Sequence, residues 1–278
     1  MPRLLSFALL FAFLGTLPTN DVIARDAPRE RERLKQETPK GQREKLSLGT
    51  LFIPEGLNTE RPVPLFIHFH AAPWLPEVAA ARQKVAIISV NLGQGSSVYA
   101  KPFADPKVFL ELLKEAETKA GLKFGIVGLT AWSAGYGAVR AILQDKDAFE
   151  RVGFVVLIDG MHASYKDKSD KTITPEHVDI CARFAADAAA GKKQMIVTHS
   201  EIVPEGYSST TETADYLLKK LDLKREAVVK EGPMKTRQLT EAKKGNFTLI
   251  GYAGKEAADH IDQLHSLPDY LKWVRWDK

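Results

Sequence analysis

Ser133 is the residue of this sequence whose surroundings most clearly suggest chemistry. It is the centre of the pentapeptide Ala131-Trp132-Ser133-Ala134-Gly135. The apolar run 124–129 before it has the length of a strand, and the apolar residues of 138–143 after it recur with helical spacing. A chain that turns directly from a strand into a helix crowds the positions two residues from its apex, and residues 131 and 135 are both small. We therefore expect only the Ser133 side chain to project from this turn.

The pattern of a strand, a small residue, x-Ser-x-Gly and a helix resembles the nucleophile elbow of the α/β-hydrolase family. The family commonly has Gly where this chain has Ala131, a difference of one methyl group. The resemblance covers about Leu48 to Trp276. It implies an enzyme without a cofactor, in which a serine is acylated by its substrate and the acyl-enzyme is then hydrolysed.

A serine hydroxyl becomes a good nucleophile only when a base removes its proton, and histidine is the usual base. In the family that resembles this chain, the nucleophile, the acid and the histidine follow one another in that order. His260 follows the last expected strand by a short loop and directly precedes a helix, as the family's histidine does. His265, five residues further on, is the second candidate.

The imidazole needs a carboxylate that holds it in the correct tautomer. Asp159 ends the strand after the elbow helix, and Glu201 follows the next strand, where the family more often has its acid. The stretch around Glu201 lacks the usual Asp. We favour Asp159 and keep Glu201 as the alternative, which gives a predicted triad of Ser133, Asp159 and His260.

Negative charge that develops on a substrate oxygen must be met by backbone N–H donors. The resemblance assigns one donor to Ala134, directly after the serine, and the other to the loop after an early strand. That loop reads His68-Phe-His70-Ala71-Ala72, with alanines in place of the family's glycines, so we expect Ala71 or Ala72 to donate. Four further residues near these strand ends are expected to contact the substrate: His70, Trp132, Tyr99 and His162.

A second group of residues suggests a different reaction chemistry. Four histidines lie near strand ends: His68, His70, His162 and His199. A His-x-His pair on a strand places both rings on one face, which is a familiar zinc spacing, and with Asp159 a metal-dependent hydrolase is conceivable. This alternative leaves the turn at Ser133 unexplained. A catalytically inactive protein of the same fold, used for binding, is the third hypothesis.

The elements that must position these residues alternate along the chain. Short apolar runs, expected to be strands, occur at 48–54, 64–69, 85–90, 124–129, 152–158, 194–198 and 246–250. Helical patterns are expected at 106–120, 138–143, 175–190, 211–221 and 261–276, and the polar stretch 91–105 is expected to be a loop. This alternation predicts an α/β fold in which a mainly parallel, twisted sheet lies between two layers of helices. Ligands of such sheets bind beyond the carboxyl ends of the strands, where the polar residues gather.

The amino terminus has the pattern of an export signal. Met1-Pro-Arg3 is basic, residues 4–17 are almost wholly apolar, and Val22-Ile-Ala24 suits a signal peptidase. We expect a signal peptide at 1–24, a charged linker or loose helix at 25–45, and one hydrolase domain at 46–278. The protein would then be secreted or periplasmic, without a stable membrane anchor after cleavage.

Composition narrows the range of partners. The formal net charge is +4, and the sequence has no basic stripe interleaved with aromatic residues, so we expect no nucleic-acid partner. The single cysteine, Cys181, cannot form an intrachain disulfide. The sequence thus predicts an exported serine hydrolase of the carboxylesterase type that acts on a small-molecule or polymer ester.

Overall fold

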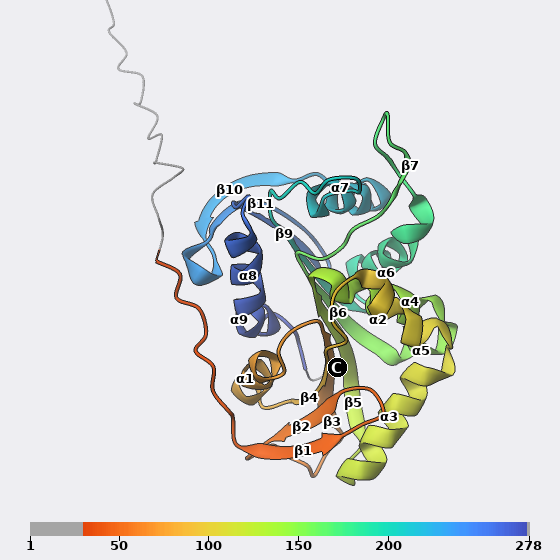
Figure 1. The fold of residues 1–278 in the computed structure, drawn as a ribbon, viewed down its shortest axis with the longest axis vertical. Helices are drawn as coiled ribbons and strands as arrows, with labels where there is room; N and C mark the ends of the chain where they lie inside the picture. Colours follow the sequence, from red (N-terminus) through yellow and green to blue (C-terminus); the bar gives the residue numbers. More distant parts are fainter. Residues whose placement is uncertain (1–29, 277–278) are drawn as a thin grey trace, which may run out of the picture. The chain divides into compact units, whose positions relative to one another are not determined.

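The computed structural model describes residues 30–276. Within these residues, one sheet has the strand order β1-β2-β4-β3-β5-β6-β9-β12-β11-β10 (Figure 1). Its strands are β1 Gly41–Lys45, β2 Thr50–Pro54, β3 Val63–Phe69, β4 Ala86–Val90, β5 Phe124–Trp132, β6 Val152–Ile158, β9 Gln194–His199, β10 Glu226–Glu231, β11 Arg237–Lys244 and β12 Phe247–Tyr252. A two-stranded ribbon is formed by β7 Tyr165–Asp167 and β8 Thr172–Ile173.

The centre of the sheet, from β4 to β12, is parallel, and both of its flanks are antiparallel. The central strands are apolar on both faces and almost wholly buried, as expected of strands that are covered on both sides. The predicted mainly parallel α/β sheet is therefore confirmed.

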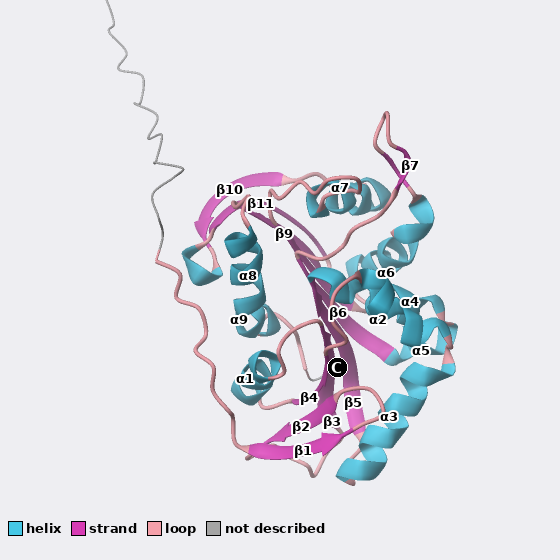
Figure 2. Cartoon of the chain, viewed as in Figure 1, coloured by secondary structure: helices cyan, strands magenta, loops and turns pink. Residues whose placement is uncertain are grey.

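Helices cover both faces of this sheet, as Figure 2 shows in cyan against magenta strands. Two apolar clusters, one on each face, bury the contacts between helices and sheet. One face carries α1 Trp74–Gln83, α8 Ala257–His265 and α9 Leu267–Leu271. The other carries α2 Ser96–Ala100, α3 Lys107–Ala120, α4 Tyr136–Gln144, α5 Lys146–Arg151, α6 Asp179–Ala189 and α7 Thr210–Leu221. Short 3-10 turns are η1 Lys101–Ala104, η2 Ser133–Gly135, η3 Pro175–His177 and η4 Pro233–Lys235.

Several local expectations differ from the structure. The stretch 91–105, expected to be a loop, contains α2 and η1, which pack on the sheet through Tyr99 and Phe103. Helix α1 and the hairpin of β10 and β11 were not anticipated. The expected closing helix is divided between α8 and α9, because Pro268 starts a new helix at its first turn.

Only part of the expected linker, and none of the expected signal peptide, lies within the described residues. The expected signal peptide, 1–24, lies outside the described residues, as does the start of the expected linker. The described residues from Arg31 onward form one compact unit. Residues 41–45, expected to belong to the linker, form β1 instead, because pairing with β2 satisfies their backbone groups although their side chains are exposed. None of the helices within 30–276 combines the length and the apolar character needed to cross a bilayer.

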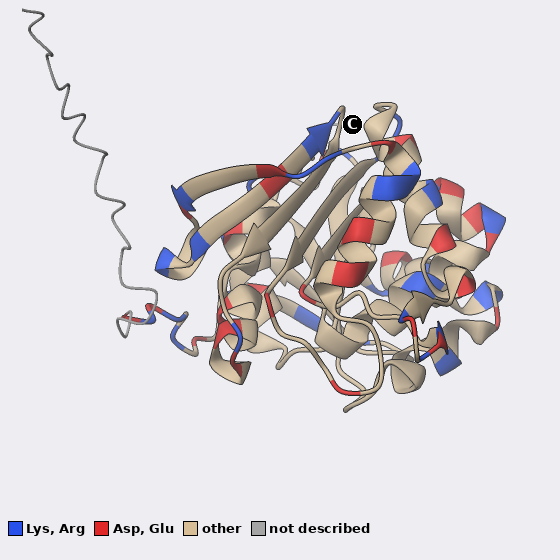
Figure 3. Ribbon diagram, turned by 90° about the horizontal axis from the view of Figure 1, so that it is seen from above, with Lys and Arg blue, Asp and Glu red and all other residues tan. Residues whose placement is uncertain are grey.

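Charged side chains of both signs are interspersed over the ribbon. In Figure 3, blue and red segments are scattered among the tan ones on both helices and strands. At the carboxyl ends of the central strands, His70 follows β3, Ser133 follows β5, Asp159 follows β6 and His199 ends β9.

Candidate active site

The turn at Ser133 is sharp and strained. Strand β5 ends at Trp132, Ser133 has a φ of 48°, and α4 follows after the single 3-10 turn η2. A positive φ at a residue with a Cβ costs about 1–3 kcal/mol and persists only where the surroundings impose it. Ser133 itself is half-buried, whereas Ala131 before it is fully buried.

Two glycines let neighbouring strand ends approach this turn closely. A Cβ at Gly135 would lie 2.3 Å from the carbonyl oxygen of Phe69, at the end of β3. A Cβ at Gly160, directly after β6, would lie 2.5 Å from both the nitrogen and the oxygen of Ser133. Neither contact is possible for a larger residue, so backbone contacts fix the serine between the ends of β3 and β6.

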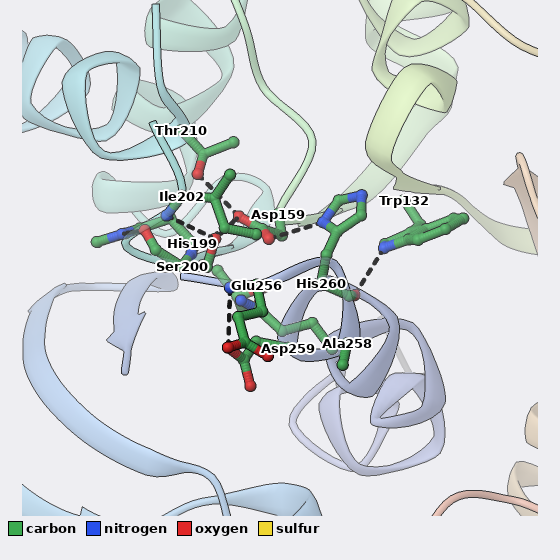
Figure 4. A network of polar contacts seen from close by, with 12 residues as sticks. Trp132, Asp159, His199, Ser200, Ile202, Thr210, Glu256, Ala258, Asp259 and His260 are labelled. Atoms are coloured by element: carbon green, nitrogen blue, oxygen red, sulfur yellow. Dashed lines mark hydrogen bonds and ion pairs between the residues drawn. The ribbon is translucent and has the colours of Figure 1, made fainter. Parts of the chain in front are cut away.

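Asp159 and His260 form a hydrogen-bonded pair at the same edge. The Nδ1 atom of His260 lies 2.8 Å from Oδ2 of Asp159 (Figure 4). The carboxylate is buried, with 1% of its side chain exposed, and the imidazole is 21% exposed. Because the carboxylate accepts this bond, Nδ1 carries the proton and Nε2 is left as a proton acceptor.

The other oxygen of Asp159 is held by neutral donors. Oδ1 accepts hydrogen bonds from the Ser200 backbone N–H at 2.8 Å, from the Ser200 hydroxyl at 3.0 Å and from the Thr210 hydroxyl at 2.8 Å. Burial opposes ionisation of this carboxyl group, but the bonds from His260, Ser200 and Thr210 outweigh it and lower its pKa. Asp159 is therefore an ionised carboxylate whose Oδ2 is directed to the imidazole.

Trp132 joins the serine turn to the helix that carries His260. Its indole N–H donates to the His260 carbonyl at 3.0 Å, and its ring lies 4.6 Å from the imidazole, centroid to centroid. On its other side it stacks with His70, with a centroid distance of 5.0 Å and an interplanar angle of 11°. Since Trp132 precedes Ser133 in the chain, these contacts bring the base and the nucleophile to one region.

The expected oxyanion donors lie around the same turn. Ala134 is in η2, which packs on the end of β3 through Gly135 and Phe69. Ala71 and Ala72 follow β3, after His70 has turned the chain with a φ of 73°. Ala71 is buried and Ala72 is exposed. The end of β3, two residues before Ala71, thus lies against the turn that contains Ala134.

Comparison with known proteins adds to this geometry. No protein-family model and no curated protein matches the chain. Among solved structures, the esterase of Pyrobaculum calidifontis is 11% identical, and the match covers 85% of this chain and 85% of that one with a TM-score of 0.51. A cold-adapted esterase from an Arctic intertidal metagenomic library is 14% identical over 83% of this chain and 90% of its own, with a TM-score of 0.46. The chain has the α/β-hydrolase fold.

In this α/β-hydrolase fold, the two alternative residues lie apart from the pair. Glu201 is exposed, and within the described residues its carboxylate accepts one long bond, of 3.3 Å, from the Gly254 backbone N–H. His265 is at the last residue of α8, and its ring packs on Trp74 at 5.9 Å. Burial lowers the pKa of His265. Neither side chain contacts Asp159 or His260 in the hydrogen bonds of the described residues.

Of the residues that we expect to contact the substrate, Tyr99 is too buried to do so, whereas His162 is only half-buried. Tyr99 is fully buried, and its hydroxyl lies 2.8 Å from Nδ1 of His70, so it holds that ring and cannot line a pocket itself. His162 is half-buried between the edges of Tyr136 and Tyr207, and its Nδ1–H donates to the Ser208 carbonyl at 2.8 Å. Burial lowers the pKa of both His70 and His162, which keeps them neutral near neutrality.

The four histidines of the metal hypothesis have separate partners. His68 is buried and bonded to Thr130, and burial lowers its pKa to about 3. The Nε2 atom of His199 accepts from Arg225 at 2.7 Å, and burial together with that guanidinium lowers the pKa of His199 to about 4. Within residues 30–276, no three His, Cys, Asp or Glu side chains are grouped as metal ligands. Among the described residues, the four rings therefore do not form the metal site that this alternative requires.

Sequence reasoning missed the residues that hold Asp159. Ser200 directly follows β9, and Thr210 is the first residue of α7, whose Ser209 and Glu212 form a capping box. The Ser-Ser-Thr-Thr-Glu run at 208–212 could have indicated the start of this helix. The sequence carried no sign that the helix begins against the Asp159 carboxylate.

Proposed function

We propose that this protein is a serine hydrolase that acts on carboxylic esters, with Ser133 as nucleophile, His260 as base and Asp159 as the acid that orients the base. The observation that carries the proposal is the 2.8 Å bond between His260 and a buried, ionised Asp159, at the sheet edge that also carries the strained turn of Ser133. The likeness to the esterase of Pyrobaculum calidifontis supports the ester as substrate class.

In the first step, the Ser133 hydroxyl attacks the ester carbonyl carbon while Nε2 of His260 takes its proton. Asp159 accepts the Nδ1–H bond throughout and stabilises the imidazolium without taking the proton itself. The carbonyl oxygen gains negative charge in the tetrahedral intermediate. The backbone N–H of Ala134 and that of Ala71 or Ala72 are the proposed donors to this oxygen.

The intermediate collapses when the C–O bond to the alcohol breaks and His260 returns its proton to the leaving oxygen. An acyl group then remains on Ser133. Water attacks this acyl-enzyme with His260 as base again, and release of the carboxylic acid restores the serine hydroxyl. Each proton that His260 accepts is donated in the same half-reaction, so the imidazole ends each cycle neutral.

The test compares the wild-type protein with Ser133→Ala. Wild type is expected to hydrolyse p-nitrophenyl esters and to gain the mass of one fluorophosphonate adduct at Ser133. The variant should lose labelling and about 10⁴-fold or more in kcat/KM, because the attacking group is gone. Ser97→Ala, at an exposed serine of α2, is the matched control. Equal rates for wild type and Ser133→Ala would refute the proposal, and a wild type that neither hydrolyses nor labels would indicate a binding protein.

Export is a further part of the proposal, supported by the basic start and apolar stretch of residues 1–24. Expressed in a bacterial host with its native amino terminus, the protein should be found outside the cytoplasm with a new amino terminus near residue 25. Recovery of the uncleaved chain from the cytoplasm would refute export while leaving the hydrolase proposal intact.

A further inference from the structure

Residues 31–34 form a short strap that binds to the helix carrying His260. Arg31 and Arg33 both form ion pairs with Asp262 of α8, the latter at 2.7 Å. Glu32 pairs with Lys235 of η4 at 2.5 Å, and Leu34 packs against the apolar cluster on this face. In Figure 1 the chain from residue 30 to β1 runs along the side of the fold that carries α8 and α9.

The strap also binds to the turn of α8 that contains His260. The Arg31 guanidinium lies 3.1 Å from Oδ1 of Asp259, and that of Arg33 donates to the Ala258 carbonyl at 2.9 Å. The contacts therefore cover residues 258, 259 and 262, on both sides of position 260. Each is more than 220 residues away in the sequence.

Asp262 makes these contacts necessary. Its side chain is 0% exposed, whereas those of Arg31 and Arg33 are 29% and 32% exposed. A carboxylate removed from water is strongly unfavourable unless cations compensate it, while a partly exposed guanidinium keeps much of its hydration. Loss of the arginines removes two cations from this buried carboxylate and favours a movement of α8 that lets water reach it, whereas loss of the carboxylate leaves the arginines partly solvated.

Movement of α8 would act on the proposed catalytic pair. On its inner side the helix is held by Trp132, which donates to the His260 carbonyl, and by Gln263, whose side chain lies 2.6 Å from the Thr198 hydroxyl. The bond from His260 to Asp159 spans 2.8 Å, so a shift of about 1 Å breaks it. The strap is the outer restraint of the same helical turn.

We propose that Arg31 and Arg33 are positioning residues, which hold the ring of His260 on Asp159 by neutralising Asp262 in the following turn of α8. The expected effect of these arginines on catalysis rests on the proposed function. Their expected effect on the His260–Asp159 bond does not. The segment between the expected signal peptide and the fold is then part of the active site's support, and its removal by a protease would inactivate the enzyme.

The experiment uses the full mature chain with Arg31→Gln/Arg33→Gln. The matched control is Lys35→Gln/Lys40→Gln, which removes the same charge from exposed positions of the same segment. The readouts are the downfield Nδ1 proton resonance of His260, amide hydrogen exchange of residues 257–265, and kcat and KM on a p-nitrophenyl ester. The arginine variant should lose the resonance, exchange faster in α8 and lose at least tenfold in kcat with little change in KM. The control should match wild type.

A rescue variant separates positioning from general loss of stability. Adding Asp262→Asn to the arginine variant removes the buried charge that needs compensation, and it should restore the resonance and most of kcat. An arginine variant with the resonance, exchange and kcat of wild type would overturn the proposal, as would a triple variant that is no better than the double one. Loss of the resonance in a protein whose wild type hydrolyses nothing would uphold the strap and refute only the hydrolase.

Discussion

Asp159 and Asp262 are two buried carboxylates on either side of the same helical turn, and the protein neutralises them differently. Asp159 is surrounded by one backbone N–H, two hydroxyls and the His260 ring. Asp262 is paired with two guanidiniums from the amino-terminal strap. Their side chains are 1% and 0% exposed, so burial alone does not distinguish them.

The difference indicates what each carboxylate does. Neutral donors stabilise the charge of Asp159 without cancelling it, so its field still acts on the imidazole at Oδ2. A guanidinium in their place would compete for the carboxylate and repel the imidazolium that forms when Ser133 is deprotonated. Asp262 is paired with two guanidiniums instead, and its contacts hold the helix rather than the imidazole.

Asp159→Asn is expected to have the largest effect. An amide cannot enforce the Nδ1–H tautomer of His260, so kcat on a p-nitrophenyl ester should fall by about 10³–10⁴-fold at neutral pH. Asp262→Asn should cost less than tenfold, because the partly exposed arginines that it releases remain hydrated. Comparable losses in the two variants would show that the contrast between the carboxylates has no functional meaning.

His199 is a buried ionisable group of the opposite kind, a base rather than a carboxylic acid. It lies beside Ser200, and burial and Arg225 lower its pKa to about 4. As pH falls through about 6.5, the unfolded chain protonates this histidine while the folded chain does not, so the folded state loses stability down to about pH 4. This contribution should amount to on the order of 3 kcal/mol.

Denaturant unfolding of wild type and His199→Gln between pH 7 and pH 4 measures how much His199 contributes to the pH dependence of the free energy of unfolding. The variant lacks the titrating group, so its stability should depend less steeply on pH across this window. The comparison cancels the slope that His68 contributes, since that ring is present in both proteins. Parallel stability curves for the two proteins would mean that His199 titrates normally in the folded chain.

Thr210→Val tests the neutral donors themselves and should have a smaller effect. The substitution keeps the shape and removes the 2.8 Å bond to Oδ1 of Asp159, while both donors of Ser200 remain. We expect kcat to fall about tenfold with KM unchanged, since one hydrogen bond to a charged group contributes about 1.5–3 kcal/mol. Thr118→Val, at an exposed threonine of α3, is the control. A change in KM alone would assign Thr210 to substrate binding instead.

The sequence could predict that Ser133 and Asp159 follow neighbouring strands because parallel strands end at one edge of a sheet, whereas His260, in α8, was chosen from the family resemblance. Short apolar runs located those ends, and the positions after them carried the polar residues. Strand β10 could not be found this way, since it is an exposed edge strand with charged residues and no apolar alternation. The strap was misjudged as part of a linker for a related reason. Its binding to Asp262 depends on charges far apart in sequence, which no local pattern records.

Glu201→Gln should have the smallest effect. The family more often places its acid after the strand that here is β9, and on that basis Glu201 was the alternative to Asp159. The structure instead leaves it exposed, and within residues 30–276 its carboxylate accepts one long bond, from the Gly254 N–H. We expect kcat and KM to change less than about twofold, because a solvated charge is screened and an amide can accept the same bond. The comparison with Asp159→Asn decides between the two carboxylates. If Glu201→Gln alone inactivated the enzyme, Glu201 would be the acid of the triad and Asp159 would have only a structural role.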